Sequence, residues 1–270
     1  MTFYKRIVLV LLLIIFVTVA PGVAQGFSDT RAHWARPQID HLHSRELLSG
    51  YPDGTYRPNA YVSREEFVTL VIKALNKENE ARQLEKGEGF FQDTRQRWSR
   101  GFIDLAQELN ITAGDGMGNF HPQRVVTRQE AVTLLVNALG TEPDLTDVEE
   151  VFFFDSADIQ DWAWASVTYA YRHGIIQGFP DMTFRPRDPV TRAQVAVMLE
   201  QFLDLRGQKY HMAGNLLHIN LPLRQAVIEI EGQKHTFELD EKLMVYGENV
   251  SEPLTELSLP SAGYFDLNSE

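Results

Sequence analysis

The stretch VSREEF at residues 62–67 puts an arginine directly after a serine that has the sequence context of a helix N-cap. The pattern returns as VTRQEA at 126–131 and as VTRAQV at 190–195. In each copy a glutamate or glutamine stands three residues after the Ser or Thr, which is the signature of a capping box. The helix starts therefore share one arginine position, occupied by Arg64, Arg128 and Arg192.

Other residues keep the same 64-residue interval, so the chain contains an internal repeat. The positions that recur are Trp34, Trp98 and Trp162; Gly50, Gly114 and Gly178; Pro58, Pro122 and Pro186; and Leu75, Leu139 and Leu203. We place the repeats at residues 27–90, 91–152 and 153–206, and the third has two extra residues before its tryptophan. Each opens with an aromatic residue, a spacer and an aspartate, which are Asp29, Asp93 and Asp155.

Each repeat is predicted to contain two helices joined by a turn-rich loop. The loops SGYPDGTYRP, AGDGMGNFHP and QGFPDMTFRP combine Gly, Pro and Asp, which are turn formers. Each loop carries one aromatic residue expected to pack on the core, namely Tyr56, Phe120 or Phe184. After the cap, apolar residues follow at helical spacing, as in Phe67, Leu70, Val71, Ala74 and Leu75. Three such stripes predict a mainly α, pseudo-threefold helical bundle.

The N-terminus has the features of a secretory signal peptide, assigned to residues 1–24. Lys5 and Arg6 precede an apolar run from Ile7 to Ala20, and small residues precede a cut after Ala24. An uncleaved membrane anchor is the alternative, although the run is short for a full span. An exported protein without a membrane span after cleavage is expected. Because the chain has no cysteine, it has no lipoprotein attachment site, disulfide or thiolate metal site.

The bulk composition excludes some partners. The 270 residues are 44% hydrophobic and 23% charged, as in ordinary globular proteins, and carry a formal charge of −12. Removing Lys5 and Arg6 with the leader would make it −14 (−12 − 2). Such a surface disfavours nucleic acid, whose binding depends on neutralising phosphates. An anionic ligand would therefore need a few local cations.

The repeated arginine permits two interpretations. A cation beside the exposed N–H groups of a helix start is unfavourable by roughly 0.3–1 kcal/mol when nothing compensates it. A helix N-terminus with an added guanidinium is, however, a good anion site. The arginines therefore either form three anion-binding grooves or pair with nearby acids such as Glu65. The tryptophans either stack on a sugar ring or plug the core. The loop aspartates Asp53, Asp115 and Asp181 lack a calcium-loop pattern and favour turn formation.

These motifs resemble the S-layer homology family, in the order FSDTRAHWA, SGYPDGTYRP and SREE, over residues 27 to about 206. The resemblance implies a three-repeat helical spindle that attaches exported proteins to the bacterial cell wall. It also implies an acidic, pyruvylated secondary cell-wall polysaccharide as ligand, bound in grooves between repeats. On this basis the three arginines contact carboxylates and the three glycines form groove walls. The tryptophans and the opening aspartates then line or shape the grooves.

The chain departs from the family pattern at a few positions. Ser63 replaces threonine, Gln194 replaces glutamate, and Met182 stands where a loop glycine is expected. The second loop, GDGMGNF, lacks the tyrosine and proline of the pattern. We therefore do not expect the three grooves to bind equally.

Residues 207–270 break the repeat. The segment AVIEIEGQKHTFEL predicts a β-hairpin with a turn near Gly232, and KLMVYGENV and AGYFDLN predict further short strands. We expect a small β-rich C-terminal unit, and truncation of a longer protein is left open as an alternative.

An enzyme is not expected, because neither a metal-ligand pattern nor a nucleophile elbow is found, and His41 and His43 diverge on a helix. No cofactor is expected. A peptidoglycan-binding or protein-binding envelope scaffold remains the alternative, and the oligomeric state stays open.

Overall fold

The computed structural model describes residues 26–86, 88–140, 143 and 153–209. In the C-terminal segment it describes 212–220, 223, 225–230, 232–238, 244–247, 250–253 and 263–265. The predicted signal peptide at residues 1–24 lies outside the described residues, as does most of the connection between the second and third repeats.

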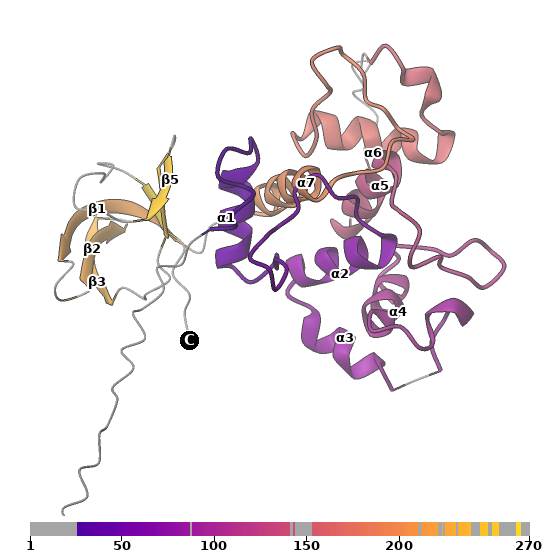
Figure 1. Cartoon of the computed structure of the whole chain (residues 1–270), viewed down its shortest axis with the longest axis horizontal. Helices are drawn as coiled ribbons and strands as arrows, with labels where there is room; N and C mark the ends of the chain where they lie inside the picture. The colour runs from indigo at the N-terminus through magenta and orange to yellow at the C-terminus, as the bar shows by residue number, and fades with distance from the viewer. Residues whose placement is uncertain are drawn as a thin grey trace, which may run out of the picture.

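The mainly α prediction is confirmed, and each repeat contributes a first helix and a second helix. The first helices are α1 (Arg36–Ser44), α4 (Arg100–Glu108) and α6 (Asp161–Arg172). The second helices are α2 (Arg64–Ala74), α5 (Arg128–Ala138) and α7 (Arg192–Leu205). Short 3-10 turns, η1 (Gln92–Thr94) and η2 (Ser156–Asp158), precede α4 and α6. The second helices lie at the centre and the first helices lie around them (Figure 1).

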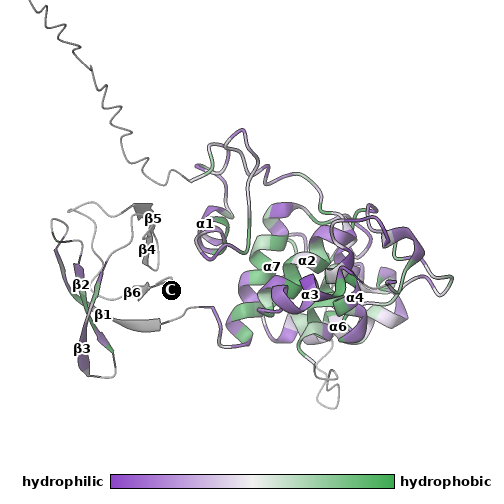
Figure 2. Cartoon of the chain, turned by 90° about the horizontal axis from the view of Figure 1, so that it is seen from below, coloured by the Kyte–Doolittle hydropathy of each residue, from purple (hydrophilic) through white to green (hydrophobic). Residues whose placement is uncertain are grey.

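The helices pack in a cyclic order that joins the three repeats. Each first helix contacts the second helix of the preceding repeat: α4 contacts α2, α6 contacts α5, and α1 contacts α7. The inward positions expected from the sequence, including Ile39, Ile103 and Val167, are buried. The loop aromatics Tyr56, Phe120 and Phe184 are also fully buried, as predicted. Apolar residues concentrate on the packed central helices, while the outer loops are hydrophilic (Figure 2).

Three backbone hydrogen bonds close this order into a ring just before the second helices. The amide of Val62 donates to the carbonyl of Val190 (3.2 Å), that of Val190 to Val126 (3.1 Å), and that of Val126 to Val62 (3.0 Å). All three valines are buried, so these bonds form out of contact with water. A ring of this kind requires one strand-like residue from every repeat, which explains why VSR or VTR recurs.

The second helices begin where the sequence predicts. Ser63, Thr127 and Thr191 are N-caps in extended conformation, and each closes a capping box with the residue three positions later. Gln194 completes its box as a glutamate would, because its side-chain oxygen accepts the amide of Thr191 at 3.0 Å. The substitution therefore removes a charge without removing the helix start.

An additional helix, α3 (Glu78–Leu84), follows α2 and packs against α4. The contact is close at Gly101, where a Cβ atom would lie 2.1 Å from the carbonyl oxygen of Ala81. Repeats one and three have Pro37 and Ala165 at the position equivalent to Gly101. The glycine therefore lets α3 approach α4 and form a wall at this junction.

The C-terminal segment forms an antiparallel sheet with the strand order β3-β2-β1-β6-β4-β5. Its strands are β1 (Met212–Asn220), β2 (Gln225–Ile230), β3 (Gln233–Glu238), β4 (Met244–Gly247), β5 (Val250–Pro253) and β6 (Gly263–Phe265). The predicted hairpin is β2–β3, in which Ile230 pairs with Gln233 and Gly232 has a φ of 78°. The sheet lies beside α1, away from the other helices (Figure 1).

Gly101 gives a direct test of the α3 contact. Glycine to alanine in a helix interior normally stabilises by about 0.5–1 kcal/mol. Because the new Cβ would collide with a backbone carbonyl, we expect Gly101→Ala to lower the free energy of unfolding by about 1–3 kcal/mol. Urea unfolding followed by circular dichroism measures this change.

Ala165 in α6 is the matched control, because it holds the equivalent position in the third repeat. Ala165→Gly should cost about 0.5–1 kcal/mol, the ordinary helix penalty. A Gly101→Ala variant that is more stable than the parent protein would contradict the close contact.

Candidate functional site

The amides at the start of each second helix are already bonded, contrary to the exposed helix end that the sequence suggested. In α2, the amides of Arg64 and Glu65 donate to the carbonyls of Arg124 and Pro122 in the next repeat, at 2.9 and 3.0 Å. The same pairs recur from α5 to Asp188 and Pro186, and from α7 to Ala60 and Pro58. The repeated prolines thus supply carbonyls that cap a neighbouring helix. An anion here would meet the guanidinium groups and not the helix amides.

Each of the three arginines extends to the loop of another repeat and stacks near its buried aromatic residue. The Cζ of Arg64 lies 4.6 Å from the ring centre of Phe120, that of Arg192 lies 4.3 Å from Tyr56, and that of Arg128 lies 5.2 Å from Phe184. Contacts of this kind favour a cation. They partly offset the unfavourable position at the helix start.

The arginines differ in how their charge is used. Arg64 is buried and donates to Glu130 at 3.2 Å, so the pairing interpretation holds for this copy with a different acid from the one expected. Arg128 is buried, and burial lowers its pKa to about 10. Arg192 is partly exposed and donates only to carbonyls, to Tyr56 at 2.8 Å and to Ser49 at 2.7 Å. Among the described residues, Arg192 makes no ion pair, so its charge is available.

The glycines lie behind the loop that receives the arginine. A Cβ at Gly50 would lie 2.1 Å from a ring atom of Phe27, and one at Gly114 would lie 2.4 Å from Phe91. A Cβ at Gly178 would lie 2.7 Å from a ring atom of Phe153. The glycines therefore let the first aromatic residue of each repeat pack against the loop. Gly50 also follows Ser49, the residue that accepts from Arg192.

The opening aspartates hold the loop backbone within each repeat. Asp93 accepts from the amides of Phe120 and His121, at 2.9 and 2.7 Å. Asp29 and Asp155 accept the two equivalent amides in their own repeats. One of these amides belongs each time to a residue in the left-handed region, which is Arg57, His121 or Arg185. Both carboxylate oxygens are thereby used internally.

The loop aspartates close their own turns, as expected. Asp53 accepts from the amide and hydroxyl of Thr55, and Asp181 accepts in the same way from Thr183. These hydroxyl bonds lower the pKa of both carboxyl groups to about 2. Asp115 makes the equivalent turn in the GDGMGNF loop by accepting from the amides of Met117 and Asn119. Met182 takes the left-handed backbone of the missing glycine, with a φ of 58°.

The tryptophans do not plug the core. Trp34, Trp98 and Trp162 are 63%, 56% and 53% exposed. Each stands at or just before a first helix, beside the second helix of the preceding repeat. An exposed indole in this position can stack on a ligand.

A cavity of about 680 Å3, which we call the inter-repeat cavity, brings some of these residues together. Its walls come from the first loop and α2, from α3, from the start of α4, and from Arg192 and Val195 of α7. Trp98 and Arg192 both line it, so a predicted tryptophan and a predicted arginine share one site although 94 residues (192 − 98) separate them. Arg64, Arg128, Trp34 and Trp162 do not line this cavity.

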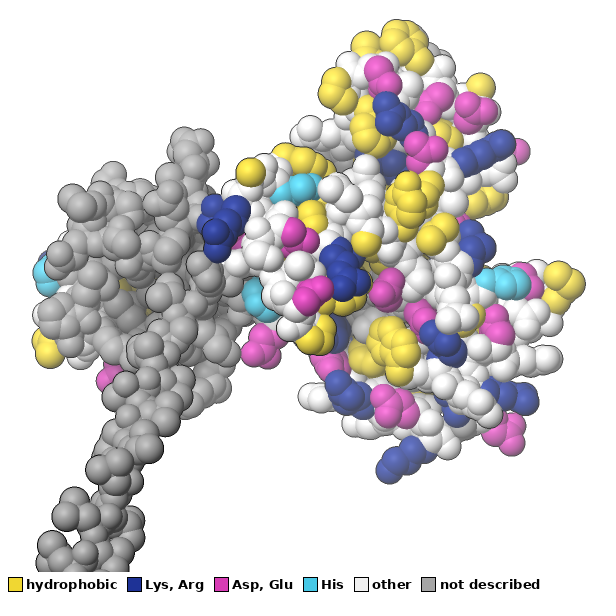
Figure 3. Space-filling view, viewed as in Figure 1, with side chains coloured by type: hydrophobic (Ala, Val, Ile, Leu, Met, Phe, Trp, Pro, Cys, Tyr) yellow, Lys and Arg dark blue, Asp and Glu magenta, His cyan; other side chains and the backbone are white. Residues whose placement is uncertain are grey.

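The inter-repeat cavity is rich in cations within an acidic protein. Its basic residues are Lys73, Arg82, Arg95, Arg97, Arg100 and Arg192, against the acids Glu66 and Glu85. Glu66 is occupied by its capping box, where it accepts the amide of Ser63 at 2.8 Å. Basic side chains, with acidic ones between them, lie over the part of the molecule formed by α3 and α4 (Figure 3). Lys73, Arg82, Arg97 and Arg100 are paired with acids outside the cavity lining. Arg95 and Arg192 form no ion pair in the described part of the chain, so these two suit an anionic ligand.

The sequence interpretation missed Lys73, Arg82 and Arg97. Lys73 has Asn137 and Gln201 at its equivalent positions, and Arg97 has His33 and Asp161. Arg82 lies on α3, a helix that the sequence interpretation did not predict. Comparing the repeats finds what they share, so it does not find side chains that make one junction differ. The one local signal was the basic residue directly before Trp98.

Two further findings bear on other classes of function. Within the described residues, no group of three or more His, Cys, Asp or Glu side chains is placed to hold a metal ion. His41 faces Glu200 at 2.9 Å and His43 faces the carbonyl of Leu48 at 2.8 Å, so the two histidines have separate partners. None of the helices in the described ranges has both the length and the apolar character needed to cross a membrane.

Comparison with known proteins gives three matches to one family. The family model described as the S-layer homology domain matches residues 26–68, 90–132 and 155–196. The chain is 31% identical, over 67% of its length, to an amylopullulanase of Thermoanaerobacterium thermosulfurigenes, and 32% identical, over 66%, to the exoglucanase XynX of Acetivibrio thermocellus. It is 29% identical, over 73% of its length, to the S-layer protein EA1 of Bacillus anthracis. The matched regions cover only 10%, 16% and 22% of these relatives.

The opening aspartates allow a test of structural against ligand-contacting roles. Because Asp93 satisfies two loop amides, we expect Asp93→Ala to lower the free energy of unfolding by about 1–3 kcal/mol. Thermal unfolding measures this loss. Asp93→Asn keeps one acceptor oxygen and should lose less. A variant that unfolds like the parent protein would show that the carboxylate does not hold the loop.

Proposed function

Because the chain carries three tandem S-layer homology repeats, we propose that they form a non-catalytic module that anchors an exported protein to the bacterial cell wall. The relatives support this proposal, since relatives named as enzymes and relatives named as S-layer proteins share this stretch. A segment common to such different proteins is suited to a role that all of them need. Attachment at the cell surface is such a role, whereas a single catalytic activity is not.

We propose that the ligand is an acidic glycan, specifically a secondary cell-wall polysaccharide carrying pyruvylated sugar. The observation that carries this proposal is the inter-repeat cavity, where Arg192 offers an unpaired charge beside the exposed indole of Trp98. A guanidinium can bind a carboxylate with two parallel hydrogen bonds, and an indole can stack on the sugar that bears it. An acidic monosaccharide would use both groups at once.

The three junctions are proposed to be unequal, with the inter-repeat cavity as the principal site. Where Arg64 meets the loop of repeat two, it already pairs with Glu130, which Arg124 also contacts. Where Arg128 meets the loop of repeat three, it is buried and donates to the carbonyl of Gln177 at 2.7 Å. The glycines and opening aspartates are proposed to support the grooves from behind, because their contacts lie within the repeats.

Co-sedimentation with wall sacculi tests the proposed function. The purified protein should bind native sacculi and lose binding once the secondary polymer has been removed chemically. Raising the salt concentration should weaken binding, because carboxylate–guanidinium attraction is screened. Binding that survives removal of the polymer would point to peptidoglycan. Binding that depends on a wall protein would favour a protein-binding scaffold.

Arg192 is predicted to contribute most of the three arginines. We expect Arg192→Ala to weaken sacculus binding by about tenfold to a hundredfold, the range for a lost hydrogen bond to a charged group. Arg192→Lys keeps the charge but not the planar fork, so it should fall between the parent protein and the alanine variant. The same co-sedimentation assay, at several protein concentrations, measures these affinities.

Arg187→Ala is the control for Arg192, because Arg187 is exposed and does not line the inter-repeat cavity. It should bind like the parent protein. Circular dichroism checks that Arg192→Ala remains folded, since Arg192 also holds two loop carbonyls. A folded Arg192→Ala protein that binds sacculi fully would refute the assigned role.

Trp98 is predicted to act by stacking. Because its side chain is more than half exposed, Trp98→Ala should leave the unfolding midpoint nearly unchanged. It should weaken sacculus binding by about threefold to tenfold, the equivalent of one aromatic contact. Trp98→Phe should restore part of this loss. Trp34→Ala, at a junction outside the inter-repeat cavity, is the matched control, and an equal loss there would argue against a principal site at Trp98.

A further inference from the structure

A second cavity of about 730 Å3 lies on repeat two, and we call it the flanking cavity. It is formed between the segment around η1 and the segment that follows the GDGMGNF loop. Three glutamine side chains, Gln92, Gln96 and Gln123, line it, and all three are exposed. Amide side chains both donate and accept hydrogen bonds, so they suit hydroxyl and acetamido groups.

The flanking cavity and the inter-repeat cavity share Arg95 and Arg97. The two hollows therefore adjoin on either side of this short segment. Arg97 is held in place, because its Nε donates to Glu65 at 3.1 Å while the hydroxyl of Ser99 donates to the same carboxylate at 2.6 Å. The boundary between the cavities thus has one fixed guanidinium.

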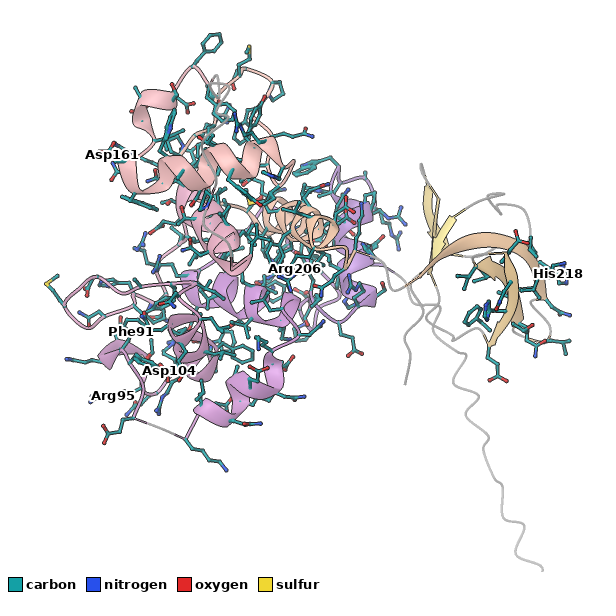
Figure 4. The ribbon with its side chains drawn as sticks, turned by 180° about the vertical axis from the view of Figure 1, so that it is seen from behind. Phe91, Arg95, Asp104, Asp161, Arg206 and His218 are labelled. Atoms are coloured by element: carbon teal, nitrogen blue, oxygen red, sulfur yellow. The ribbon has the colours of Figure 1, made fainter. Side chains whose placement is uncertain are left out.

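Arg95 is the available charge at this boundary. Its side chain is exposed and makes no hydrogen bond or ion pair to any residue in the described part of the chain. It lies at the outer edge of repeat two, on the same side as Phe91 and Asp104 (Figure 4). Asp93, the acid in the flanking cavity, is already bonded to two backbone amides. Glu85 lines the inter-repeat cavity, but among the described residues no carboxylate is bonded to Arg95, which faces both hollows.

The other repeats do not reproduce this arrangement. At the positions equivalent to Gln92, Gln96 and Gln123, repeat one has Ser28, Ala32 and Asn59. It retains Arg31 at the position of Arg95, but Arg31 lines neither cavity. Repeat three has two extra residues before its tryptophan, and it has Arg187 at the position of Gln123. The flanking cavity is thus a feature of repeat two.

We propose that the two cavities form one continuous track that binds successive sugars of a single acidic glycan chain. This inference rests on the proposed function. The inter-repeat cavity takes one acidic sugar through Arg192 and Trp98, and the flanking cavity takes a neighbouring sugar through its glutamine side chains. Arg95 contacts an acidic group of the chain where it crosses from one cavity to the other. The ligand recognised is accordingly an oligosaccharide with repeated acidic groups, and not an isolated sugar.

Isothermal titration with fragments of graded length tests the track. The probes are fragments of the secondary polymer released from sacculi by mild acid and separated by size into single repeat units and chains of three or more units. The parent protein should bind the longer chains at least about tenfold more tightly than the single units. Arg95→Ala should weaken binding of the longer chains by about threefold to tenfold and weaken binding of the single units by a clearly smaller factor.

The controls separate the track from simpler explanations. A purely statistical gain from more units per chain would persist in Arg95→Ala, and this outcome would overturn the inference. Equal weakening of both lengths in Arg95→Ala would also overturn it, because Arg95 would then belong to the principal site. Arg31→Ala, the equivalent exposed arginine of repeat one, should bind both lengths like the parent protein.

The same titrations distinguish failure of the track from failure of the proposed function. If the single units bind and Arg192→Ala weakens their binding, the principal site is supported even if the longer chains bind no more tightly than the single units. In that case the track alone is wrong. If neither length binds, both proposals fail together.

Discussion

The helical unit depends on the ring of backbone hydrogen bonds among Val62, Val126 and Val190. Each valine uses its amide toward one repeat and its carbonyl toward the other, so no two repeats alone satisfy all six groups. The ring places the start of every second helix against a neighbouring loop. That loop then caps the helix amides with its own carbonyls. Buried hydrogen bonds of this kind are costly to leave unmade, which fixes the positions of the three arginines.

Much of this fold could be predicted from the sequence because it depends on local patterns that recur. The capping boxes, the apolar stripes and the loop aromatics are all where the sequence placed them. The helix amides were wrongly expected to be free. The carbonyls that accept them belong to another repeat, and the local sequence around a helix start does not show which distant residues will pack against it. The exposure of Trp34, Trp98 and Trp162 was likewise open, since an apolar ring at a helix start suits either the core or a surface.

The candidate site was harder to predict than the fold because it depends on how the repeats differ. Repetition identified Arg192 and Trp98 as members of sets, but not as partners in one cavity. What distinguishes their junction is the lysine at position 73 and the arginine at position 97, neither of which recurs, together with α3, which has no counterpart among the described residues. Glu65 shows the same divergence: it anchors Arg97, whereas Gln129 accepts the amide of Gln160 and Ala193 has no polar side chain to offer. A symmetric backbone thus carries unequal surfaces.

The valine ring also has a consequence for how such a protein can arise and change. An open array of repeats can gain or lose a unit at its end, because each unit touches only its neighbours. A closed ring has no end, so a fourth unit would find no donor or acceptor left, and a loss would leave two units with unmatched groups. Copy number is therefore set by geometry. A single ancestral unit could have met the same requirement only as a trimer of separate chains with cyclic symmetry, which gene fusion could later join.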